Sequence, residues 1–64
     1  MKVHFYLDNV FIKTKMLKKM ELEEAKKQIE HWLIDNKGKT NRAILITETK
    51  RYEILSDSMK WIEL

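Results

Sequence analysis

The sequence has 64 residues, no cysteine, one glycine and a net charge of +3 that arises from 13 basic and 10 acidic residues. Without cysteine there is no disulfide bond and no thiolate metal site, and the single glycine, Gly38, excludes the glycine-rich loops that cradle phosphates. A chain of this length is expected to form one domain over residues 1–64 with a thin core, since it buries only about 60% of the surface of its unfolded form.

The first two predicted elements form a β-hairpin. Residues 2–7 and 10–15 are rich in β-branched and aromatic side chains, and Asp8-Asn9 between them tolerates the left-handed backbone of a two-residue turn. Regular pairing from this turn places Phe5 opposite Ile12. Side chains alternate along a strand, so the expected core face carries Val3, Phe5, Leu7, Val10 and Ile12. The outer face then carries His4, Tyr6, Phe11, Lys13 and Lys15.

An amphipathic helix is expected next, from about Met20 to Asn36. Its apolar residues recur with a period of 3.6 and share one side of the helix; they are Leu22, Ala25, Ile29, Trp32 and Leu33. Three glutamates in the first turn favour the positive end of the helix dipole, and Gly38 can supply a left-handed stop. Glu23 and Lys27 are four residues apart and are expected to pair.

Three further strands are predicted after the helix. Residues 43–47 form a continuous apolar run typical of a buried strand, residues 51–55 follow a turn at Thr49-Lys50, and residues 59–64 form a last short strand. The predicted order is ββαβββ. The fold class is α+β, with one amphipathic helix packed on a twisted antiparallel sheet of four or five strands, or on a small, partly open barrel.

This order resembles that of small uncharacterised proteins of phages and mobile elements in low-GC Gram-positive bacteria. The resemblance is carried by the Asp8-Asn9 turn, the helix start Glu23-Glu24-Ala25, the pair Trp32-Leu33 and the closing segment 58–63. It covers most of the chain and implies an accessory or host-modulating protein that acts by binding. The closing strands are also similar to the end of Sm-like small barrels, from which the helix in mid-chain departs. No functional residue is carried over from either resemblance.

The residues suited to catalysis or metal binding are few and scattered. The only serines, Ser56 and Ser58, and the two histidines lie in different elements, so no nucleophile beside a base is predicted, and Ser58 is expected to tighten a turn. Glu48-Thr49-Lys50 matches half of a nuclease motif, in which a carboxylate holds Mg²⁺ and a lysine assists water, but such tripeptides are common by chance and an ordinary turn is expected here. His31 is expected on the polar side of the helix. We therefore expect no catalytic residue, no metal site, no cofactor and no enzymatic activity.

Apolar side chains on both sides of the predicted strands indicate a binding surface. One helix covers one face of a sheet, so the other face stays exposed unless the sheet curls into a barrel or a second protein covers it. Aromatic side chains that can stack on bases and lysines that can neutralise phosphates are predicted to share the outer hairpin face and the connection after it: Tyr6, Phe11, Lys13, Lys15, Lys18 and Lys19. The alternative is an aromatic cross-strand pair with lysines that protect a sheet edge.

Trp61 is the candidate anchor of a protein interface, with packing against the helix as its alternative. The first functional hypothesis is a small protein-interaction module, a homodimer or the binder of another protein. The second is a nucleic-acid-binding protein that uses the basic and aromatic hairpin face. No run approaches the roughly 20 apolar residues of a bilayer span, and the N-terminus lacks the pattern of a signal peptide. We therefore expect no membrane association and a cytoplasmic location.

Overall fold

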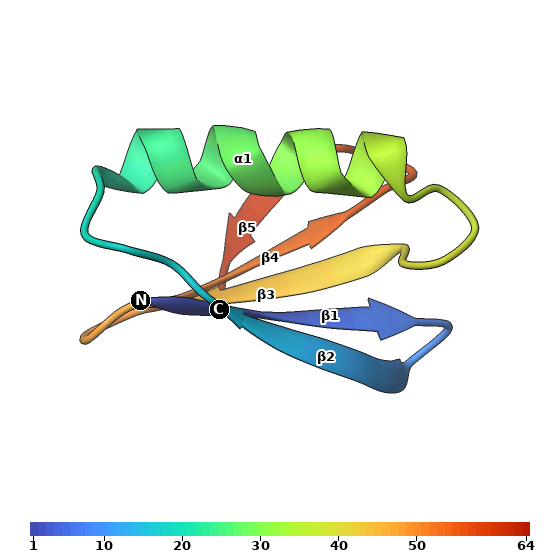
Figure 1. Cartoon of the computed structure of the whole chain (residues 1–64), viewed down its shortest axis with the longest axis horizontal. Coiled ribbons are helices and arrows are strands. Elements are labelled where there is room, and N and C mark those ends of the chain that lie inside the picture. The colour runs from blue at the N-terminus through green and yellow to red at the C-terminus, as the bar shows by residue number, and fades with distance from the viewer.

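One helix packs on one face of a five-stranded antiparallel sheet in the computed structural model, which describes residues 1–64 (Figure 1). The helix α1 spans Leu22–Asp35, and the strands are β1 (Lys2–Leu7), β2 (Val10–Met16), β3 (Arg42–Ile46), β4 (Arg51–Leu55) and β5 (Trp61–Glu63). Their order across the sheet is β2-β1-β3-β4-β5. The predicted ββαβββ order is confirmed, and the sheet is open, with β2 and β5 as its two edges.

The turn at Asp8-Asn9 joins β1 and β2 as predicted. Asp8 and Asn9 have φ angles of 49° and 68°, which are the left-handed values that a two-residue hairpin turn requires. Asn41 holds this turn from the start of β3, since its Nδ2 donates to Asp8 Oδ1 at 2.9 Å and its Oδ1 accepts from Asp8 N at 3.1 Å. The hairpin is thereby tied to the strand on its other side.

A β-bulge in β2 changes the register of the hairpin. Tyr6 pairs with Phe11, but Phe5 pairs with Lys13, so Ile12 is an extra residue without a partner of its own in β1. The prediction that Ile12 faces Phe5 is therefore wrong. Because one extra residue moves every later side chain to the other face, the faces predicted for β2 are reversed beyond the bulge. Val10 and Ile12, predicted in the core, are both exposed.

The core lies between α1 and the sheet. It is a cluster of ten buried hydrophobic residues. Leu17, which follows β2, belongs to this cluster, and its backbone N–H donates to Met1 O at 2.9 Å. The strands contribute Val3, Phe5, Ala43, Leu45, Tyr52 and Ile54, and α1 contributes Ala25, Ile29 and Leu33. Trp32, predicted in the same helical stripe, packs against this cluster from a partly buried position.

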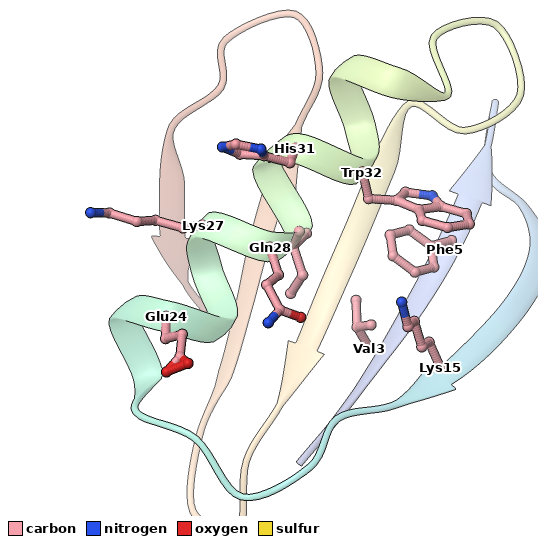
Figure 2. Close-up of a pocket in the computed structure, with 9 residues that line it drawn as sticks. Val3, Phe5, Lys15, Glu24, Lys27, Gln28, His31 and Trp32 are labelled. Atoms are coloured by element: carbon pink, nitrogen blue, oxygen red, sulfur yellow. The ribbon is translucent and has the colours of Figure 1, made fainter.

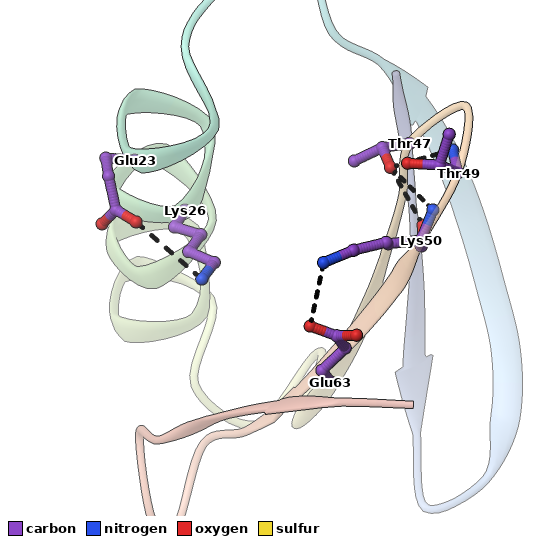
Figure 3. Close-up of polar contacts among 6 residues, drawn as sticks. All are labelled: Glu23, Lys26, Thr47, Thr49, Lys50 and Glu63. Atoms are coloured by element: carbon purple, nitrogen blue, oxygen red, sulfur yellow. Dashed lines mark hydrogen bonds and ion pairs between the residues drawn. The ribbon is translucent and has the colours of Figure 1, made fainter.

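The helix α1 begins and ends within two residues of the predicted limits. Glu23 and Glu24 occupy its first turn, and Gly38 has the left-handed φ, 90°, that was predicted for the stop. Glu23 pairs with Lys26 at 4.0 Å, and not with Lys27 as predicted (Figure 3). The ammonium of Lys26 also lies 4.7 Å from the centroid of the Tyr52 ring.

Candidate functional site

The aromatic and basic residues predicted on one hairpin face lie on opposite faces of the sheet. Tyr6 pairs with Phe11 on the face away from α1, whereas Lys13 and Lys15 pair with the core residues Phe5 and Val3 and so lie on the helix side. The predicted arrangement, in which these lysines accompany Tyr6 and Phe11, is therefore wrong. Its cause is the bulge at Ile12, which the pattern of side chains in the sequence does not reveal.

The ammonium groups of Lys13 and Lys15 lie over an indole ring. The Nζ atoms are 4.1 Å and 5.5 Å from the centroid of the Trp32 ring, and the same ring lies 5.1 Å from that of Phe5. A cation over an aromatic face is attracted by the quadrupole of the ring. The two lysines of β2 thus shield one border of the core.

The lysines of the connection between β2 and α1 lie apart from the aromatic pair. Lys18 and Lys19 are exposed and line a shallow hollow that also contains Glu21 and Glu48. Tyr6 and Phe11 lie beside the hairpin turn, at the opposite end of β2. The structure therefore does not bring the six predicted residues into one surface.

Trp61 packs against the helix, which is the alternative predicted for it. It pairs with the core residue Ile54, and its Nε1 donates to Glu30 Oε2 at 2.8 Å. Lys26 Nζ lies 5.6 Å from the centroid of its ring. The polar atom of Trp61 and much of its ring are therefore engaged within the chain.

The face of the sheet away from α1 is not covered by any element, and we call it the open face. Residues paired across neighbouring strands share a face, so the register assigns its members in three rows. One row runs through Phe11, Tyr6, Arg42 and Leu55, the next through Thr14, His4, Ile44, Glu53 and Ile62, and the last through Met16, Lys2, Ile46 and Arg51. Exposed apolar side chains lie at both borders, with Phe11 53% and Ile62 54% exposed.

Polar groups in the middle of the open face are paired within the chain. Arg42 Nε donates to Glu53 Oε2 at 2.6 Å, and the guanidinium lies 5.0 Å from the centroid of the Tyr6 ring. Phe11 stands edge-on to Tyr6, with ring centroids 5.9 Å apart and an interplanar angle of 73°. Glu53 is the only acid in the three rows and pairs with Arg42, which leaves Lys2 and Arg51, in the last row, as cations without an acidic partner on this face.

The segment that resembles half of a nuclease motif forms a turn. Thr47 Oγ1 accepts from Lys50 N at 3.0 Å and from Thr49 N at 3.3 Å, while Lys50 Nζ pairs with Glu63 Oε1 at 3.5 Å (Figure 3). The lysine is thus engaged with β5. Ser58 Oγ accepts from Lys60 N at 3.3 Å, as expected for a residue that tightens a turn.

No three His, Cys, Asp or Glu side chains are grouped so that they could hold a metal ion. His31 is exposed, as predicted. The helix α1 lacks the length and the apolar character that a bilayer-spanning helix needs.

A second surface, absent from the sequence predictions, lies on the helix side of the sheet. It is a groove of about 360 Å³ between α1 and the β1–β2 hairpin (Figure 2). It was missed because the reversed register of β2 is what places Lys15 beside the core residues. Trp32 is the only residue in the sequence that could have indicated this groove, but an aromatic residue in a helical stripe is also expected in an ordinary core.

Comparisons with protein-family models, with curated proteins and with solved structures find no match for this chain. The class that the fold itself defines is a small α+β domain with one helix on an open antiparallel sheet. The open face and the groove are its two candidate binding surfaces.

Proposed function

We propose that this chain is a small non-catalytic protein-interaction module whose open face binds a second copy of the same chain. The observation that carries the proposal is the exposed apolar character of this face at both borders, at Phe11 and at Ile62. Burying a large apolar side chain contributes roughly 1.5–3 kcal/mol when the burial is complete, so these residues favour association. Four exposed large apolar side chains lie on this one face, Phe11, Met16, Leu55 and Ile62, and exposed apolar surface indicates an interaction site.

A second copy fits this face because the charges in its first two rows, Arg42 and Glu53, pair with each other. The two other charges, Lys2 and Arg51, lie together in one end row, where a partner rotated about a two-fold axis need not place its own copies of them. Two sheets that pack face to face interdigitate apolar side chains, as in a β-sandwich, and a two-fold axis makes such an interface self-complementary. A domain with only ten buried hydrophobic residues also gains from burying more apolar surface on association.

Strand addition at the edge of the sheet is a poorer route to the same dimer. The edge strand β2 carries a bulge and two lysines, Lys13 and Lys15, that point toward the helix side. Bulges and inward-pointing charges are the devices by which natural sheets block edge pairing. The interface is therefore assigned to the open face and not to β2.

The wider role follows from the sequence resemblance. It is an accessory or host-modulating role in a phage or mobile element. A cytoplasmic location is proposed separately, from the sequence pattern described above. The nucleic-acid hypothesis required one surface that holds both the aromatic residues and the lysines of the hairpin. Lys13 and Lys15 instead lie on the other side of the sheet from Tyr6 and Phe11. It is kept as an outcome of the experiment below.

Light scattering behind a sizing column tests the proposal. Over a hundredfold range of loading concentration we expect the mass to approach twice the 7.8 kDa of one chain. The variants Phe11→Asp and Ile62→Asp should shift it toward one chain with an unchanged circular dichroism spectrum. Ile34→Asp is the matched control, because Ile34 is 61% exposed but lies on α1.

A wild-type protein that stays monomeric at every concentration would contradict the proposal. So would a dimer whose mass is unaffected by both open-face variants. The ratio of absorbance at 260 and 280 nm across the peak tests the other hypothesis, since co-eluting nucleic acid raises it. Nucleic-acid binding would also weaken steeply with added salt, whereas an apolar dimer would not.

A further inference from the structure

His4 is the only histidine on the open face, and it lies in the middle row, between Thr14 of β2 and Ile44 of β3. Its side chain is half-buried. The ring is held on the β2 side, where its Nδ1 lies 2.6 Å from Thr14 Oγ1 and its centroid lies 5.7 Å from that of Phe11, at an interplanar angle of 67°. The contact with Thr14 is its only hydrogen bond within the chain. The imidazole therefore has a fixed place within the surface that the proposed dimer buries.

No acidic side chain is free to pair with His4. The titratable and charged groups that share the open face with it are Lys2 and Tyr6 on β1, Arg42 on β3, and Glu53 and Arg51 on β4. The strand β2 adds none, since its two lysines lie on the helix side. Glu53 is in the same row as His4, but Ile44 separates the two, and Glu53 Oε2 accepts from Arg42 Nε at 2.6 Å. A proton taken up by His4 thus adds a charge that has no acidic partner on this face.

We propose that His4 makes the dimer sensitive to pH, so that two copies associate above about pH 7 and separate below about pH 6, the range in which imidazole takes up its proton. This inference rests on the proposed function, because it concerns the same face. A face-to-face dimer removes both copies of His4 from water, and burying a charge without a partner is costly. Separated copies leave each ring in contact with water. Protonation of His4 therefore favours the separated copies.

The sign of the pH dependence follows from the number of bound protons. The separated copies bind more protons than the dimer, so acid favours separation. The Kd of the dimer should be nearly constant above about pH 7.5 and should rise as the pH falls through about 6.5. At about pH 5.5 each of the two rings contributes roughly tenfold, and together they raise the Kd about a hundredfold.

Sedimentation equilibrium at pH 7.5, 6.5 and 5.5, at constant ionic strength, measures the Kd of the dimer. For the wild type we expect the rise of about a hundredfold between pH 7.5 and pH 5.5. For His4→Gln we expect a change of less than about threefold, because the amide stays uncharged at each pH and can still bond to Thr14. Circular dichroism at each pH checks that the chain remains folded.

His31→Gln is the matched control. His31 is the other histidine of the chain and is exposed on α1, so this variant should keep the full rise in Kd. Because His4 is then the only histidine, the same variant assigns the effect if His4→Gln folds poorly. His4→Arg carries a charge at every pH and should dimerise as weakly at pH 7.5 as the wild type does at pH 5.5.

The outcomes separate this inference from the dimer on which it rests. A wild-type dimer with the same Kd at pH 7.5 and pH 5.5 would overturn the inference and leave the dimer standing. A rise in His4→Gln equal to that of the wild type, or a loss of the rise in His31→Gln, would also overturn it. A wild-type protein that is monomeric at pH 7.5 at every concentration would overturn the dimer and the inference together.

Discussion

Asn9 has a backbone conformation that few side chains tolerate. Its φ is 68°, and its Oδ1 accepts from Arg42 Nη1 at 3.2 Å. A residue with a Cβ atom loses about 1–2 kcal/mol in the left-handed region, Asn and Asp lose less, and glycine loses nothing. We expect Asn9→Ala to lower the free energy of unfolding by about 1 kcal/mol and Asn9→Gly to change it by less than about 0.5 kcal/mol.

Urea unfolding followed by circular dichroism measures both variants of Asn9. Equal destabilisation by alanine and glycine would show that the contact with Arg42, and not the backbone conformation, is what Asn9 contributes.

Trp61 combines apolar packing with one hydrogen bond, to Glu30 Oε2. Phenylalanine keeps most of the ring and loses the donor, so Trp61→Phe should lower the free energy of unfolding by about 1 kcal/mol. Trp61→Ala also removes the packed ring and should cost about 3 kcal/mol. The ring lies on the helix side, so Trp61→Phe should leave the mass in solution unchanged. A shift to monomer in the folded Trp61→Phe protein would instead support Trp61 as an interface anchor.

At the scale of elements, β2 shows how the free side of an edge strand is kept from pairing with another chain. All seven of its residues are exposed, and three consecutive apolar residues follow the turn: Val10, Phe11 and Ile12. The bulge at Ile12 twists the strand, and Lys13 and Lys15 place charges on the inward side, where a pairing chain would have to bury them.

Replacing these two charges should expose the edge to pairing. We expect the double variant Lys13→Val, Lys15→Val to aggregate, because it creates a continuous apolar β segment at the edge of the sheet. The matched double variant Lys18→Val, Lys19→Val changes the net charge equally outside β2 and should remain in solution. Turbidity and thioflavin binding measure the difference, and similar behaviour of the two proteins would refute a protective role of the β2 lysines.

At the scale of the whole molecule, the thin core makes stability sensitive to single residues. A 64-residue domain is stabilised by about 3–10 kcal/mol in total. Leu33 is fully buried, and Leu→Ala at such a site costs about 2–5 kcal/mol. We therefore expect Leu33→Ala to leave a large fraction of the chain unfolded at 25 °C. Ile34 is its neighbour on the exposed side of α1, and Ile34→Ala should cost less than about 0.5 kcal/mol.

Near-ultraviolet circular dichroism at a fixed protein concentration measures the effect of Leu33→Ala, since association would shift the apparent stability. A well-folded variant with the wild-type spectrum would mean that the core is less cooperative than this small cluster indicates.

The sequence by itself determined the order of elements and most of their limits. The hairpin turn, the helix and the strand 51–55 follow from turn chemistry and from periodicities of 3.6 and 2, which depend on neighbouring residues only. The buried stripe of α1 at Ala25, Ile29 and Leu33 follows from the same periodicity. These features were predicted because each is decided over a few residues.

Only the tertiary structure decided which side of the sheet each residue of β2 occupies. The run Val10-Phe11-Ile12 is apolar throughout, so no alternation in it shows where an extra residue lies, and the bulge is fixed by pairing with β1. The openness of the sheet, the packing of Trp61 on α1 and the groove beside Lys15 likewise depend on contacts between distant residues. Because side chains alternate with a period of two, one unpaired residue was enough to separate Lys13 and Lys15 from Tyr6 and Phe11.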